Sequence, residues 1–139
     1  MSMAGRHKAM EFRDFYLSAQ GRVTRSQFWL RLVAPLIGGG LVLGMVDAVL
    51  GTWDPKHGAG LFSGLFLLAA MVPTVHVQIK RLHDRDKSGW WMMMAVFPVI
   101  GAIWLLVELG LLRGTQGPNQ FGPEPGGDGG PLPTDATLP

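Results

Sequence analysis

Three long apolar stretches dominate the pattern of hydrophobic and polar positions along the chain. The ionisable residues inside them are few: Asp47 between positions 32 and 50, His76 between 59 and 79, and Glu108 between 90 and 112. An α-helix rises about 1.5 Å per residue, so each stretch would cover roughly 30 Å, the thickness of a bilayer's hydrocarbon core. The pattern predicts an all-α integral membrane protein, a three-helix bundle with spans at about 28–50, 59–79 and 90–112.

The flanking segments differ from this membrane domain, which we place at residues 28–113. Residues 1–27 are polar with scattered aromatic residues and form an N-terminal segment. Within it, residues 10–20 predict either a short interfacial helix or a segment docked on the protein's own loop. In residues 114–139, Gly and Pro make up 13 of 26 positions, a composition typical of a disordered tail.

Small residues and prolines suggest how the spans pack. Gly40 and Gly44, and likewise Gly60 and Gly64, have the Gly-x-x-x-Gly spacing that allows close helix contact. This spacing serves either packing within the bundle or a homo-oligomer. Pro98 is expected to kink the third span.

The distribution of charge predicts an orientation. Ten Lys or Arg residues lie before the first span or between the second and third spans, and two lie on the other side. This bias places the N-terminus and the loop at 80–89 in the cytoplasm. Three spans would then place the C-terminal tail outside. The chain has no cysteine, which excludes a disulfide framework and thiolate chemistry.

The stretch RLHDRDKSGWWMMM (81–94) carries the densest candidate chemistry. Its residue types suit a water-facing corner between two spans, with Trp90 at the membrane interface. Alternatively, arginine side chains there could bind the phosphate of a lipid headgroup, and His83 could exchange a proton near neutral pH. Catalysis by His83 and Asp84 is the third interpretation, although adjacent residues of one helix do not face each other.

The charged residues of the apolar stretches suggest a second hypothesis. Asp47 and Glu108 are both predicted near the outer ends of their spans, where they either reach interfacial water or form an ion or proton site. Together with His76 they would serve a small transporter or a proton-coupled channel. The four histidines do not form a metal-ligand set, and we predict no metal, no cofactor and no nucleic-acid partner.

Three motifs resemble a known family. The segments DFYLSAQGRVTRSQFW, PTVHVQIKRLHDRDKSGWW and GTQGPNQFGPEP occur in the order of the signature regions of the bacterial family called domain of unknown function 805. The resemblance covers roughly residues 12–125. The matching positions are Gly21, Arg22, Arg25 and Trp29, then Arg81, Leu82, His83, Asp84, Ser88, Gly89, Trp90 and Trp91, then Asn119, Gly122 and Pro123.

The resemblance implies location more than activity, namely a small multi-pass protein of the bacterial inner membrane. It implies no catalytic residue. We therefore predict a non-enzymatic protein with a cytoplasmic cluster that is structural or binds an anionic lipid headgroup or a membrane-protein partner. The candidate residues are Arg22, Arg25, Arg81, His83, Asp84 and Trp90. Asp84 is expected to bridge Arg22 or Arg25 to the 80–89 loop, whereas three spans place Asn119 on the opposite side. A membrane enzyme acting on lipid phosphate is the remaining alternative.

Overall fold

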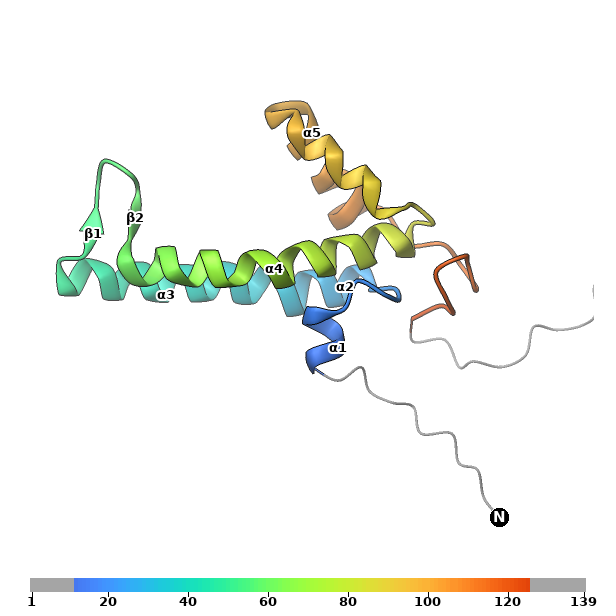
Figure 1. Cartoon of the computed structure of the whole chain (residues 1–139), viewed down its shortest axis with the longest axis horizontal. Coiled ribbons are helices and arrows are strands. Elements are labelled where there is room, and N and C mark those ends of the chain that lie inside the picture. Colours follow the sequence, from blue (N-terminus) through green and yellow to red (C-terminus); the bar gives the residue numbers. More distant parts are fainter. Residues whose placement is uncertain (1–11, 126–139) are drawn as a thin grey trace, which may run out of the picture. The chain divides into compact units, whose positions relative to one another are not determined.

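The computed structural model describes residues 12–125, and its contacts divide the chain into two units. The first unit contains residues up to 19 and residues 29–78, and the second contains residues 20–28 and those from 79 onward. Two helical runs of the described residues, Arg25–Leu50 and Leu61–Asp84, are long and apolar enough to cross a membrane (Figure 1). The predictions of spans at 28–50 and 59–79 therefore have helical counterparts in the structure.

The first unit is built on two of these helices. The π-helical turn η1 (Phe28–Val33) leads into α3 (Ala34–Leu50), and α4 (Leu61–Asp84) contributes its residues up to position 78. Between them, β1 (Trp53–Asp54) and β2 (Ala59–Gly60) form a short antiparallel pair. In the turn of this pair, the hydrogen bonds from His57 and from the Lys56 backbone hold the pKa of Asp54 below its usual value.

Asp47 joins the two helices of the first unit. Its fully buried carboxylate accepts hydrogen bonds from the hydroxyl of Thr52 at 2.6 Å and from the backbone N–H groups of Phe62 and Ser63 at 2.9 and 2.8 Å. The first N–H groups of a helix lack partners within that helix, so Asp47 caps α4 from another element. Gly60 is required beside it, because a Cβ at that position would overlap the carboxylate.

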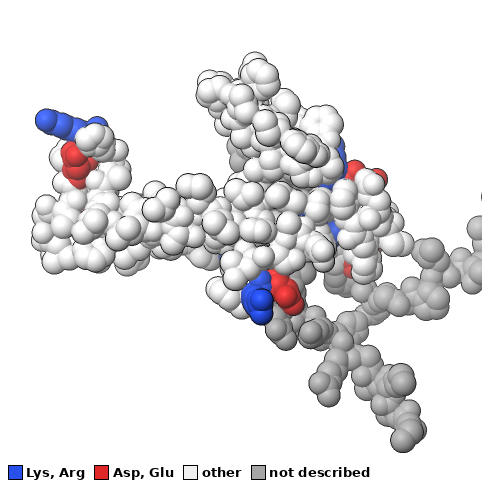
Figure 2. Space-filling view, in the orientation of Figure 1, with Lys and Arg blue, Asp and Glu red and all other residues white. Residues whose placement is uncertain are grey.

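The surface of the first unit has the charge pattern of a membrane span. Figure 2 shows charged side chains at the turn between β1 and β2 and beside α1 (Phe12–Leu17), with uncharged surface along the helices between them. α1 lies within residues 10–20, where either an interfacial helix or a docked segment was predicted, and its Phe15 is buried. The guanidinium of Arg31 lies 5.3 Å from the centre of the Phe15 ring, and the Tyr16 hydroxyl donates to the Arg31 carbonyl at 2.5 Å.

The second unit corrects the prediction of a single helix over 90–112. It contains α2 (Arg25–Gln27), the end of α4, the 3₁₀-helix η2 (Gly89–Val96), α5 (Pro98–Leu105) and the π-helical turn η3 (Leu106–Leu111). The chain turns at Phe97, and η2 and α5 pack against each other as a helical hairpin (Figure 1). Pro98–Leu111 is the shorter apolar helix that remains.

Proline and glycine explain the turn. Proline disfavours helical geometry in the preceding residue, and Phe97 is extended with φ −91° and ψ 101°. Pro98 then starts a new helix at a position where proline is well tolerated, instead of kinking a continuous one. Gly101 lets the hairpin close, because a Cβ there would overlap the carbonyl oxygen of Met94. Trp91 and Trp104 stack between the two arms, with ring centres 5.3 Å apart.

The first part of the predicted disordered tail is folded. Residues 114–125 make defined contacts in the second unit, including a hydrogen bond from the Thr115 N–H to the carbonyl of Asp84 at 2.7 Å. Asn119 and Gly122 close a turn through two backbone hydrogen bonds of 3.0 and 3.1 Å. Gly122 has φ +132°, a conformation that glycine adopts readily. The remainder of the predicted tail, residues 126–139, lies outside the described residues.

The hairpin predicts the effect of a methyl group at Gly101. Gly101→Ala should lower the free energy of unfolding by about 1–3 kcal/mol, because the Cβ forces the two arms apart. The near-ultraviolet circular dichroism signal of the stacked tryptophans should fall with it. Gly38→Ala is the matched control, since nothing lies within 4 Å of that Cβ position. Equal stability of both variants in detergent would contradict the hairpin.

Candidate functional site

The interior of the second unit is unusually rich in charge. Its buried charged residues are Arg22, Lys80, Arg81, Asp84 and Glu108, beside the buried apolar residues Val23, Phe28, Leu82 and Leu109. Charged side chains are rarely buried unless they are paired and hydrogen-bonded. The interior therefore depends on how these charges are satisfied.

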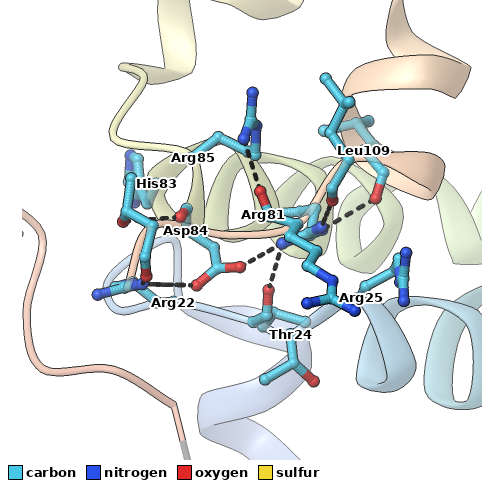
Figure 3. A network of polar contacts seen from close by, with 12 residues as sticks. Arg22, Thr24, Arg25, Arg81, His83, Asp84, Arg85 and Leu109 are labelled. Atoms are coloured by element: carbon cyan, nitrogen blue, oxygen red, sulfur yellow. Dashed lines mark hydrogen bonds and ion pairs between the residues drawn. The ribbon is translucent and has the colours of Figure 1, made fainter. Parts of the chain in front are cut away.

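Asp84 places its carboxylate between two guanidinium groups (Figure 3). Arg22 donates to Oδ1 from Nε at 3.0 Å and from Nη2 at 2.9 Å, and Arg81 donates to Oδ2 from Nη1. Arg81 and Asp84 lie three residues apart in α4, a spacing that puts both side chains on one face of the helix. The expectation that Asp84 bridges to Arg22 is confirmed. We call Arg22, Arg81 and Asp84 the buried triad.

The remaining donors of the triad are used by backbone carbonyl groups. Arg22 donates to the carbonyls of Gly117 at 2.6 Å and Thr115 at 2.5 Å. Arg81 donates to Leu109 from Nε at 2.9 Å and to Leu112 from Nη2. The two guanidinium groups thereby fix the chain after η3, and their side chains are 1% and 0% exposed. A phosphate could reach these arginines only by displacing these contacts.

Two residues after η3 complete the enclosure of Asp84. Thr115 donates to the Asp84 carbonyl from its backbone N–H at 2.7 Å and from its hydroxyl at 3.0 Å. Gly114 passes so close that a Cβ there would overlap the carboxylate. The sequence interpretation missed both residues because their segment has the composition of a disordered tail. The family-like segment GTQGPNQFGPEP, which begins with these two residues, was the available signal.

His83 and Asn119 lie together, which corrects the expectation that Asn119 is on the opposite side. The Asn119 amide donates to the His83 carbonyl at 2.8 Å, and the Phe121 ring stacks on the His83 imidazole at 4.0 Å. Nδ1 of His83 lies 3.3 Å from the carbonyl of Gly21. All four residues belong to the second unit. The three-span topology from which the expectation followed does not account for this contact.

Glu108 forms a second ion-paired group. Its Oε1 lies 3.0 Å from Nε of Arg85 and 2.9 Å from Nζ of Lys87. The Lys87 ammonium also lies 4.8 and 5.0 Å from the ring centres of Trp91 and Trp104, within the range of cation–π attraction. Glu108 was predicted at the far end of a span from the 80–89 loop. Its pairing with Arg85 and Lys87 shows that it lies beside that loop, because the hairpin returns the chain.

The other predicted site residues are not part of the triad. Arg25 is exposed and donates to the Leu111 carbonyl at 3.0 Å, and Trp90 is 80% exposed. Asp47 belongs to the first unit, where its carboxylate caps α4. His76 bonds the Val72 carbonyl of its own helix at 2.8 Å. The predicted cluster is thus divided. Arg22, Arg81 and Asp84 are buried, whereas Arg25 and Trp90 lie at the surface.

The chemistry available at the triad is limited. Each Asp84 oxygen accepts from a guanidinium, and the imidazole of His83 is covered by Phe121. Within residues 12–125, no group of three His, Cys, Asp or Glu side chains could hold a metal ion. The triad holds chain segments together. The groups most accessible to a ligand are the other cations of the second unit, which lie at its surface.

Comparisons with known proteins extend these observations. The family described as Protein of unknown function (DUF805) matches residues 16–123, a range that includes both Arg22 and the turn at Asn119. The inner membrane proteins YhaH and YhaI of Escherichia coli K12 are 35% and 33% identical over 111 residues, covering 79% of this chain and 88% and 87% of theirs. The uncharacterized protein YiiR of the same strain is 27% identical, covering 81% of this chain and 89% of its own length.

These matches confirm the family resemblance inferred from the three motifs. The relatives' names, with the two long apolar helices, support the prediction of an inner-membrane protein. No solved protein structure shows significant similarity to the chain.

The triad predicts that Arg22 contributes much more to the free energy of unfolding than Arg25 does. Arg22→Ala should lower the free energy of unfolding by about 3–5 kcal/mol, because it leaves a buried carboxylate short of a partner. Arg25→Ala removes the same group from the surface and should cost no more than about 1 kcal/mol. Denaturant unfolding of both variants in one detergent measures the difference. Equal losses would show that Arg22 is not part of a buried ion pair.

Proposed function

The chain belongs to the DUF805 family of proteins of unknown function, and from this premise we propose that it is a non-enzymatic inner-membrane protein whose second unit binds anionic phospholipid at the cytoplasmic face. The observation that carries the proposal is a division among the arginines of this unit. Arg22 and Arg81 are saturated inside the fold, whereas Arg25 and Arg113 remain exposed.

The charge of the second unit supports this interpretation. Its described residues include seven Lys or Arg and four Asp or Glu, a formal charge of +3. Trp90 and Trp91 are exposed beside them, and tryptophan is enriched at the level of lipid headgroups. Basic residues near an anionic membrane surface are attracted by about 1 kcal/mol each. An excess of cations next to exposed tryptophans suits contact with that surface.

The proposed topology has two spans, α3 and α4, and a hairpin that enters the membrane and returns to the same face. The arm Pro98–Leu111 has eight residues in α5 and six in η3. These cover about 21 Å, less than the ~30 Å of a hydrocarbon core. Glu108, near the end of the hairpin, pairs with Arg85, which precedes its start. Both ends of the hairpin therefore belong at one face.

This topology strengthens the charge bias used to orient the protein. Arg113 joins the ten cations already assigned to the cytoplasm, and Lys56 is left as the cation of the opposite face. The N-terminus and the segment after the hairpin are then both cytoplasmic.

The alternative functions have less support in the contacts. The Asp47 carboxylate is occupied as a helix cap and Glu108 by two cations, which disfavours them as ion or proton sites of a transporter. His83 and Asp84 are likewise engaged by Phe121 and two arginines, which disfavours a phosphate-cleaving enzyme. A homo-oligomer or a membrane-protein partner stays a prediction.

Single cysteines test the proposed topology directly, because the chain has none of its own. In intact spheroplasts, a membrane-impermeant maleimide should label Lys56→Cys but neither Gln120→Cys nor Ser88→Cys. All three should react after the membrane is permeabilised. Labelling of Gln120→Cys from outside, with Ser88→Cys protected, would instead support a third span.

Lipid composition tests the binding function. In nanodiscs, replacing part of the phosphatidylcholine with phosphatidylglycerol should raise the midpoint of thermal unfolding, and salt should reduce the gain because it screens exposed charges. Arg25→Gln/Arg113→Gln should lose most of the gain, whereas Arg13→Gln/Lys56→Gln, which removes the same charge from the first unit, should keep it. An unchanged midpoint in wild type would contradict anionic lipid binding.

A further inference from the structure

A polar groove of about 290 Å³ lies in the second unit beside the buried triad. One part of its wall comes from Thr24, Arg25 and Ser26, and another from the chain that follows η3, with Arg113 among its residues. Asp84 contributes to the lining, and Glu124 lies in the last described segment. Two arginines that are distant in sequence thus line one groove.

Both arginines keep donors that the fold does not use. Among the described residues, the Arg25 guanidinium gives one hydrogen bond, from Nη1 to the Leu111 carbonyl at 3.0 Å. The Arg113 guanidinium makes no hydrogen bond or ion pair within residues 12–125, although its carbonyl accepts from Arg85. A guanidinium has five N–H donors in a planar fork that suits phosphate oxygens. Ser26 also lines the groove, and a serine hydroxyl can donate with another geometry.

The charge balance of the groove is positive. Asp84 contributes little free negative charge, because Arg22 and Arg81 each pair with one of its oxygens. Glu124 is the other carboxylate of the lining, and its Oε2 accepts from the N–H of Gly117 at 2.8 Å. Arg25 and Arg113 together outweigh it. A doubly charged tetrahedral anion complements two forked cations better than a singly charged one.

We infer that the groove between Arg25 and Arg113 is a binding site for a phosphate monoester group. Such a group carries about 1.5 to 2 negative charges near neutral pH and has three strong acceptor oxygens. The inference deepens the proposed function and rests on it for a membrane source of the ligand, since phosphatidic acid presents this group at a bilayer surface. A soluble phosphate compound presents the same group.

The test uses the full chain in phosphatidylcholine nanodiscs. Native mass spectrometry compares retention of phosphatidic acid with retention of phosphatidylglycerol, and calorimetry measures binding of inorganic phosphate. Phosphatidic acid should be retained at least tenfold more strongly than phosphatidylglycerol by wild type, and Arg25→Gln/Arg113→Gln should lose this preference. Arg13→Gln/Lys56→Gln, with the same change in charge, should keep it.

The single variant Arg113→Gln guards against loss of the fold, because the Arg113 guanidinium makes no hydrogen bond or ion pair with the described residues. This variant should bind phosphatidic acid at least severalfold more weakly than wild type does, while unfolding at the wild-type temperature. Binding of inorganic phosphate that depends on both arginines, without a preference for phosphatidic acid, would support the site and assign it a soluble ligand.

Two results would overturn the site. One is equal binding by wild type and by the folded Arg25→Gln/Arg113→Gln variant, and the other is binding of neither phosphatidic acid nor phosphate. If phosphatidylglycerol still stabilises the wild type in either case, the proposed anionic-lipid function stands and this site alone fails. Conversely, phosphate binding without any stabilisation by anionic lipid would contradict the proposed lipid-binding function and support the phosphate site.

Discussion

The second unit depends on one buried carboxylate. Asp84 holds Arg22 and Arg81 at its two oxygens, and these arginines hold the backbone carbonyls of residues 109–117. A buried guanidinium without partners is very costly, so the chain after η3 cannot leave without exposing or stranding these charges. The triad thereby joins the segment before α2, the end of α4 and the chain after the hairpin.

The hairpin brings the chain that follows it back to the end of α4, where the triad lies. A continuous helix from Gly89 to Leu111 would carry Glu108 far from Arg85, but the turn at Phe97 brings the chain back. Pro98 imposes the extended residue before it, and Gly101 permits the close approach of the two arms. Two residues with special backbone chemistry thus determine whether the segment forms one continuous helix or a hairpin.

The arginines of the second unit have separate roles, although the motifs present them together. Arg22 and Arg25 are three positions apart, yet one is enclosed by carbonyl oxygens and the other lines an open groove. Enclosure uses the donors that would recognise a ligand, and exposure leaves them available. We therefore assign stability to the enclosed arginines and propose ligand binding for Arg25 and Arg113.

The sequence by itself determined the features that follow from composition and local pattern. Long stretches poor in charge predicted helices over 28–50 and 59–79, and the order of three motifs identified the family. The family-like motifs, with Arg22, Arg25 and Asp84 at matching positions, also led to the expected bridge from Asp84 to Arg22 or Arg25, which the structure shows at Arg22.

The tertiary structure decided the rest. Apolar residues between 90 and 112 suit a single span and a hairpin equally well, because hydropathy does not record the direction of the chain. The Gly- and Pro-rich segment after residue 113 cannot fold by burying apolar surface, so its composition predicts disorder. It is held instead by its backbone carbonyl groups, which accept hydrogen bonds from the guanidinium of Arg22, far away in the chain. Every residue carries such a carbonyl, so no sequence pattern distinguishes the ones that are used.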